Sequence, residues 1–105
     1  MTAEDVISAM TERIVEQFHP VSVILFGSCA RGEAGRESDV DLLVVLPRVK
    51  DKRRETVAIR RALADFPMSK DIIVTTPEEI ERRGNAVGTV LRPALREGRV
   101  LYEQT

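Results

Sequence analysis

The chain has 105 residues, enough for one hydrophobic core and too few for two, so we expect a single domain spanning residues 1–105. Hydrophobic residues make up 43% of the sequence and charged residues 31%, a balance that excludes a disordered chain. The formal net charge of −1 gives no overall attraction to nucleic acid or to an anionic membrane. Three Phe, one Tyr and no Trp are too few for a base-stacking surface, so direct nucleic-acid binding is not expected.

The cysteine content and the first residues bear on the compartment. The single cysteine, Cys29, cannot form an internal disulfide. The segment Met1–Asp5 lacks the basic and apolar regions of a signal peptide, and no apolar run is long enough to span a membrane. We therefore expect a cytoplasmic protein without a membrane partner.

The first part of the chain predicts a helix, two strands and a short helix between them. Apolar residues recur at three- and four-residue steps before His19-Pro20, which predicts an amphipathic helix that the proline closes. The β-branched run Val21–Phe26 predicts a strand covered on both faces. The small residues of Ser28–Ala34 permit a short helix, and Asp39–Leu46 predicts a central strand with an acidic start.

The second part of the chain predicts alternating helices and strands. Asp51–Asp65 has helical spacing, and its expected buried side consists of Ala58, Ile59, Ala62, Leu63 and Phe66. Asp71–Thr75 predicts a third strand, and Thr76–Arg83 a helix with Thr76 as its N-cap. Ala86–Glu97 predicts a last helix, and Val100–Tyr102 a short edge strand. This order of elements indicates an α/β (α+β) fold.

Asp39 and Asp41 are two residues apart in a predicted strand, so their side chains should point to the same face. Two carboxylates about 5 Å apart repel by roughly 3 kcal/mol at an effective dielectric near 20, and a divalent ion removes that penalty. Oxygen-only ligands favour hard ions, so Mg²⁺ is expected, with Mn²⁺ as a substitute. On these residues alone, a turn residue and a solvated strand end remain the alternative.

Gly27-Ser28 follows the first predicted strand and precedes the short helix. Gly27 allows a close approach of the backbone to a ligand, and Ser28 can offer its N–H and hydroxyl to phosphate oxygens at a helix start. Arg31, one turn further on, could add a positive charge. An ordinary strand-to-helix turn with Ser28 as N-cap explains the same residues, and only the neighbouring acids favour phosphate binding.

Taken together, Gly27-Ser28, ten intervening residues and Asp39-Val40-Asp41, with Ala30-Arg31-Gly32 and Ser38 between them, resemble the signature of the polymerase-β-like nucleotidyltransferase superfamily. In particular the chain is similar to the minimal nucleotidyltransferases of prokaryotes, which are single domains of about this size. The resemblance extends from Val21 through Thr75. It implies a mixed sheet of three to four strands flanked by helices.

The resemblance implies roles for seven residues. Those expected to hold the triphosphate are Gly27 and Ser28, with Arg31 and Arg36 as candidates to neutralise it. Those expected to bind two Mg²⁺ ions are Asp39 and Asp41, with Asp71 as a third carboxylate that helps to deprotonate the attacking hydroxyl. Asp71 matches because it too begins an apolar strand after a helix, and the alternative is a capping or turn aspartate. For Arg36 the alternative is a solvated charge.

The resemblance also implies ATP as substrate and an acceptor carried by a partner. Minimal nucleotidyltransferases are typically encoded beside a helical HEPN-domain protein, as toxin–antitoxin pairs, and some transfer AMP from ATP to a tyrosine of that toxin. Two alternatives are a non-catalytic antitoxin that neutralises a helical partner by complex formation, and nucleotidyl transfer to a small molecule. The preferred nucleotide, the acceptor and the oligomeric state, a homo-oligomer included, are left open by the sequence.

The most basic stretch of the sequence comprises Arg48, Lys50, Lys52, Arg53 and Arg54. Such clusters are usually solvated faces. The functional alternative is a contact for an acidic partner or for RNA.

Overall fold

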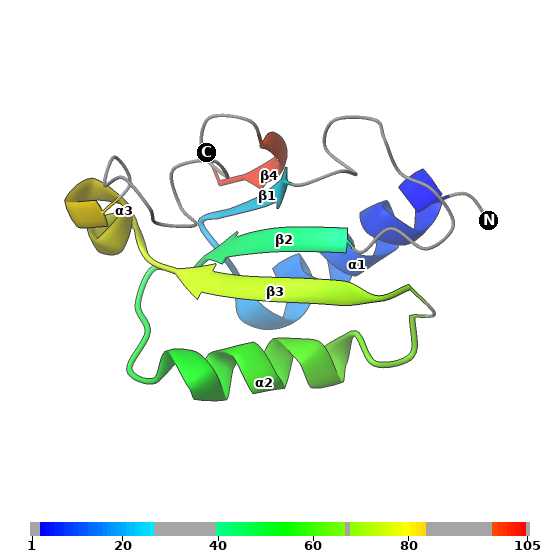
Figure 1. The fold of residues 1–105 in the computed structure, drawn as a ribbon, viewed down its shortest axis with the longest axis horizontal. Coiled ribbons are helices and arrows are strands. Elements are labelled where there is room, and N and C mark those ends of the chain that lie inside the picture. The colour runs from blue at the N-terminus through cyan, green and yellow to red at the C-terminus, as the bar shows by residue number, and fades with distance from the viewer. Residues whose placement is uncertain (1–2, 27–39, 67, 84–97, 105) are drawn as a thin grey trace.

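The computed structural model describes residues 3–26, 40–66, 68–83 and 98–104 (Figure 1). Three helices and four strands form in this part of the chain, in the order α1 (Ala3–Phe18), β1 (Ser22–Phe26), β2 (Val40–Val45), α2 (Lys52–Ala62), β3 (Lys70–Thr75), α3 (Pro77–Arg83) and β4 (Arg99–Glu103). The predicted helices at Ser28–Ala34 and Ala86–Glu97 lie outside the described residues. In the described part of the chain, no helix combines the length and apolar character that crossing a bilayer requires.

The four strands form one mixed sheet in the order β3-β2-β1-β4. β1 is antiparallel to both β2 and β4, whereas β2 and β3 are parallel and are joined by a crossover that contains α2. The predicted α+β fold with three to four strands is therefore confirmed. The prediction that β2 is a central strand is also confirmed, and β4 is the predicted edge strand, extended by one residue at each end.

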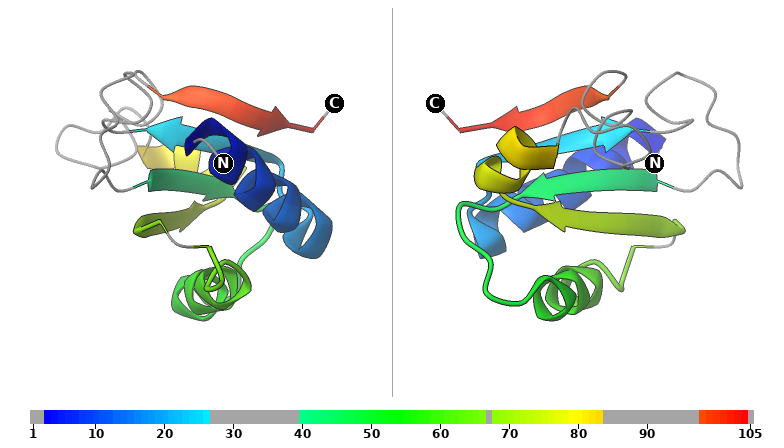
Figure 2. Two further views of the ribbon diagram at one scale, coloured as in Figure 1. Left: turned by 90° about the vertical axis from the view of Figure 1, so that its right-hand side faces the viewer. Right: turned by 60° about the vertical axis from the view of Figure 1, so that its left-hand side comes forward.

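One face of the sheet packs against α1 and α2. The side chains that meet there come from alternate positions of the strands, and they include Val40, Leu42 and Val44 of β2 together with Met10 and Ile14 of α1 and Ile59 and Leu63 of α2. Figure 2 shows α1 lying across this face, with α2 alongside β3. Because every second residue of a strand points to the same side, the odd-numbered residues of β2 must point away from this core.

The opposite face carries a smaller apolar cluster. Its buried members are Ile24, Leu43 and Val45, and the half-buried Ile73 of β3 and Ile80 of α3 pack against them. The residues at the middle of β1 are buried on both faces, as the sequence predicts.

α1 ends before His19-Pro20, as the sequence predicts. Its buried stripe of Val6, Ile7, Met10 and Ile14 has the spacing of one helical face. The helix stops at Phe18 because His19 adopts a positive φ of 49°, and Pro20 then prevents a further helical turn.

α2 is capped by the Asp51 side chain, which accepts a hydrogen bond from the Arg54 N–H. It ends at Ala62, three residues before the predicted limit, because the backbone tightens at Leu63, whose N–H reaches the carbonyls of both Ile59 and Arg60. The expected burial of Ala58 is wrong: it is exposed, since the buried stripe runs through Ile59 and Leu63.

Thr76 caps α3 as predicted. Its hydroxyl accepts a hydrogen bond from the Glu79 N–H at 3.2 Å, and Pro77 occupies the first helical position. The Glu79 carboxylate pairs with Lys52 of α2, so the starts of these two helices are joined by an ion pair.

Candidate functional site

Asp41 and Asp71 lie side by side at the edge of the sheet where β2 and β3 begin. The two strands are parallel, and the register pairs Val40 with Lys70 and Asp41 with Asp71. Neighbouring strands lie about 4.8 Å apart, and residues in register point to the same face, so the two carboxylates can converge on one ligand. The structure thus places two of the three predicted metal-binding carboxylates together.

The face that carries this pair is the one opposite α1. Asp41 alternates with Val40 and Leu42, which belong to the core under α1, so its side chain points to the side of Leu43 and Val45. Phe26, the last described residue before Gly27, pairs with Asp41 in the antiparallel β1–β2 ladder. The end of β1 and the starts of β2 and β3 therefore meet at one sheet edge.

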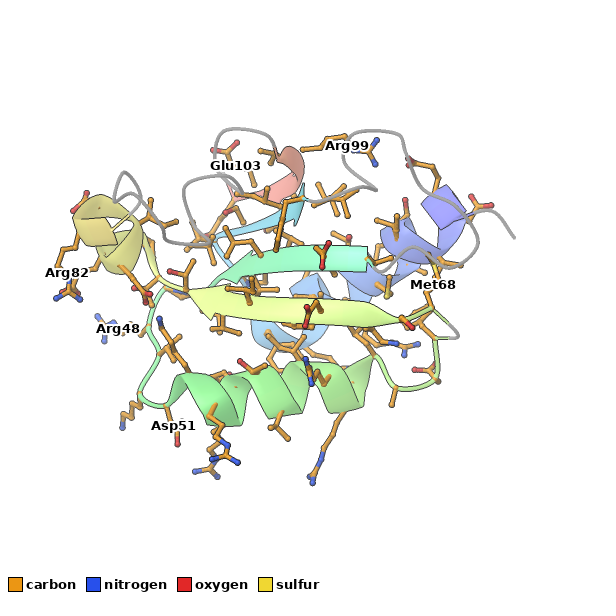
Figure 3. The ribbon with its side chains drawn as sticks, in the orientation of Figure 1. Arg48, Asp51, Met68, Arg82, Arg99 and Glu103 are labelled. Atoms are coloured by element: carbon orange, nitrogen blue, oxygen red, sulfur yellow. The ribbon has the colours of Figure 1, made fainter. Side chains whose placement is uncertain are left out.

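The position of Asp71 is fixed by the turn that precedes β3. The Lys70 ammonium donates to the carbonyl oxygens of Phe66 and Met68, at 3.1 and 2.8 Å. The Lys70 partner in the ladder, Val40, donates its N–H to the Ser69 carbonyl at 2.9 Å. Figure 3 labels Met68 just before β3, at the edge of the sheet described above.

Arg60 of α2 is the charged neighbour of Asp71. Its guanidinium donates to Asp71 Oδ1 at 3.2 Å, and the two side chains are 54% and 62% exposed. An exposed ion pair of this kind is worth between about 0 and 1 kcal/mol, so Arg60 can leave Asp71 at little cost. Its positive charge reduces the repulsion between the two carboxylates.

Sequence reasoning did not identify Arg60. It precedes Asp71 by 11 residues, and the two meet only because α2 packs alongside β3. The one signal in the sequence is that Arg60 adjoins the buried Ile59, which fixes the side of α2 that faces the sheet.

The other predicted site residues lie outside the described part of the chain, namely Gly27, Ser28, Arg31, Arg36 and Asp39. Within the described residues, no three His, Cys, Asp or Glu side chains gather as a metal site. Asp41 and Asp71 supply two carboxylates on one face, an all-oxygen donor set that fits a hard divalent cation.

A groove of about 570 Å³ lies elsewhere, between α1 and β4. The described residues that line it include Glu12, Glu16 and Tyr102 and no basic residue, and the two carboxylates disfavour a triphosphate there. It is separate from the edge that carries Asp41 and Asp71, which do not line it.

Comparison with known proteins gives a family and a fold. A family model described as a nucleotidyltransferase domain matches residues 7–101. The crystal structure of a Sulfolobus solfataricus protein that has been suggested to be a nucleotidyltransferase superposes on this chain with a TM-score of 0.66 and 19% sequence identity. The match covers 95% of this chain and 79% of that one. A chain from the crystal structure of a toxin-antitoxin with AMP-PNP superposes with a TM-score of 0.56 and 19% sequence identity, and the match covers 93% of this chain and 74% of that one. At such identities the two structures show a shared fold. No curated protein matches the sequence.

Proposed function

Because the chain belongs to the nucleotidyltransferase domain family, we propose that it transfers AMP from ATP to a hydroxyl group. The observation that carries the proposal is the register of β2 and β3, which sets Asp41 beside Asp71 on one face of the sheet. Such a carboxylate pair suits a reaction in which a hydroxyl must lose a proton beside a triphosphate.

In this reaction the residues would have the following roles. Gly27 and Ser28 would bind the triphosphate through backbone and hydroxyl groups, and Asp39 and Asp41 would hold Mg²⁺, with Mn²⁺ as a substitute. Asp71 would share a metal ion and accept the proton of the attacking hydroxyl. When bound, the ions would activate that hydroxyl and balance the charge of the leaving pyrophosphate. The new bond joins the acceptor oxygen to the α-phosphorus, and the bond between the α-phosphorus and the bridging oxygen breaks.

Arg31 and Arg36 would neutralise the triphosphate. Arg60 would add to them, because it lies within 3.2 Å of Asp71 on an exposed side chain that can turn towards a bound anion. In the structure the same guanidinium donates a hydrogen bond to Asp71.

The acceptor we propose is a tyrosine of a helical toxin of the HEPN type, so that the chain acts as an antitoxin. Support comes from the structural likeness to a chain of a toxin-antitoxin that was solved with AMP-PNP. The described helices and strands all take part in the sheet or pack on its two faces. In this proposal a second protein presents the hydroxyl.

The test uses the full chain, Mg²⁺ and the purified protein encoded beside it, with ATP labelled on either the α- or the γ-phosphate. We expect the α-label to reach a tyrosine of the second protein and the γ-label to be released in pyrophosphate. Asp41→Asn and Asp71→Asn should abolish labelling while the two proteins still form a complex. Transfer of the γ-label, or a stable complex without any label, would overturn the proposal, and the second result would indicate a non-catalytic antitoxin.

A further inference from the structure

The outer face of α2 carries a concentration of positive charge without described counterions. Residues 48–61 contain seven Lys or Arg and two Asp or Glu, whereas the whole chain has a formal net charge of −1. Figure 3 shows Arg48 and Asp51 at the loop that leads into this helix. No described element covers the side of α2 that is turned away from β3 (Figures 1 and 2).

We call the exposed residues of this side the α2 basic stripe, namely Arg53, Arg54, Val57, Ala58 and Arg61. All five are exposed, and they line a shallow groove of about 440 Å³ together with the N-cap Asp51. Their spacing of three, four and seven residues places them along one side of the helix. The stripe therefore has two arginines at one end, one at the other and small apolar groups between them.

The arginines of the stripe have no counterion in the described part of the chain. The neighbouring cations are already paired, Lys52 with Glu79 and Arg60 with Asp71. Arg53, Arg54 and Arg61 have no ion pair with any described carboxylate. A face of unpaired arginines around an apolar centre has the composition of a protein interface more than that of a merely solvated helix.

The centre of the stripe distinguishes a protein ligand from a nucleic acid. Val57 is 42% exposed, and with Ala58 it offers methyl groups where a nucleic-acid site would place aromatic rings. None of the four aromatic residues lies in the stripe. Small side chains at this position also permit the interaxial distance of about 8–10 Å at which two helices pack.

We propose that the α2 basic stripe docks an acidic amphipathic helix of the acceptor protein. Arg54 and Arg61 are seven residues apart, two helical turns or about 10 Å, so the partner helix would carry carboxylates at the same spacing on either side of an apolar residue. The identification of the docked protein as the acceptor rests on the proposed function, whereas the docking itself does not.

The stripe is well placed to bring an acceptor to the site. Arg60 follows the stripe residue Ala58 by two positions, precedes Arg61 and hydrogen-bonds to Asp71. Arg60 therefore lies between the stripe and the carboxylate pair. A helix held on the stripe would bring the segments that flank it to the edge where β2 and β3 begin.

The experiment measures docking without nucleotide or metal. The probe is a fluorescent synthetic peptide of about five helical turns, with Glu residues flanking a Leu and Ala stripe at seven-residue spacing. It is titrated with the full chain and followed by fluorescence anisotropy. Each exposed pair is expected to contribute about threefold to the affinity, so Arg54→Gln with Arg61→Gln should weaken binding about tenfold.

The controls separate this proposal from others. Arg99→Gln, on the opposite edge strand, should leave peptide affinity unchanged, and far-UV circular dichroism should show that the variants fold, because only exposed side chains are altered. Equal binding of a peptide with the same composition and scrambled charges would overturn the proposal. So would unchanged affinity of the double variant, or tighter stripe-dependent binding of single-stranded RNA.

The failure of this inference can be distinguished from failure of the proposed function. If peptide docking requires the arginines but no AMP is transferred, only the proposed function fails. If AMP transfer to the acceptor continues at the full rate in the double variant, the docking surface is refuted and the transferase function stands.

Discussion

Substitution of Asp71 by Asn should separate the proposed metal-binding role of the carboxylate pair from its contribution to the fold. The side chain is 62% exposed, and among the described residues it forms an ion pair with Arg60. The substitution loses this exposed ion pair, worth less than about 1 kcal/mol, and also relieves repulsion from the neighbouring Asp41. Because the Asp71 side chain is exposed, an effective dielectric near 80 applies, and it reduces the roughly 3 kcal/mol expected near a dielectric of 20 to less than about 1 kcal/mol. The two effects are of opposite sign. We therefore expect the free energy of unfolding without metal to change by less than about 0.5 kcal/mol.

With a divalent ion present, the wild-type protein and the variant should differ clearly. An ion that binds only the folded state at ten times its Kd adds about 1.4 kcal/mol to the free energy of unfolding. In a domain of this length, that gain raises Tm by about 6–11 °C. Asp71→Asn should lose most of the shift, and Asp41→Asn should behave in the same way because the two residues are in register.

The assay is thermal unfolding followed by circular dichroism, since the chain has no Trp and one Tyr. Chelator-treated protein is measured with increasing Mg²⁺ or Mn²⁺. The matched control is Glu103→Gln, an exposed carboxylate on β4 that should leave the shift intact. If Asp71→Asn retains the full metal-induced shift, the carboxylate pair is not the metal site.

Three further predictions follow from single contacts. Arg60→Gln removes the cation beside Asp71 and should raise Mn²⁺ affinity two- to fivefold by titration calorimetry, and unchanged affinity would contradict a competing role for Arg60. Thr75→Val should raise the free energy of unfolding in urea by about 1 kcal/mol, because the buried Thr75 hydroxyl has no hydrogen-bond partner among the described residues, and destabilisation would contradict this. The hydrogen bond from Arg13 holds the pKa of Asp65 below its ordinary value, so this contact stabilises the fold above about pH 4 and is lost as the pH falls through the lower folded pKa. The stability difference between the wild type and Asp65→Asn should therefore shrink in acid, and a difference independent of pH would refute the assignment.

The helices and strands were predictable because their signals are local. The spacing in α1, the β-branched run of β1 and the Thr76-Pro77 start of α3 depend on neighbouring residues only, and each appears in the structure. The C-terminal end of α2 was less well predicted. The backbone hydrogen bonds of the Leu63 N–H end the helix, although the apolar residues that follow still have helical spacing.

The candidate site was predictable in its composition and only partly in its geometry. The acidic starts of two apolar strands indicated that Asp41 and Asp71 share a sheet edge. Their register could not be deduced, because it depends on the length of the crossover and on how α2 packs against β3. Arg60 was missed for the same reason, since its contact with Asp71 requires the tertiary arrangement.

The sheet topology is compatible with a proposed site in which one short segment supplies both the phosphate and the metal ligands. β1 and β2 are antiparallel, and Phe26 pairs with Asp41, so both ends of the segment 27–39 are attached at the edge where β2 begins. The parallel crossover through α2 then returns the chain to the same edge at Asp71. Strand pairing thus brings Phe26, Asp41 and Asp71 to one edge of the sheet, while the exposed arginines of the proposed docking surface lie on α2. The carboxylate pair and the arginines of the proposed docking surface therefore lie on different elements, with Arg60 in contact with Asp71 between them. Substitutions at Asp71 and at Arg54 and Arg61 should therefore have separable effects.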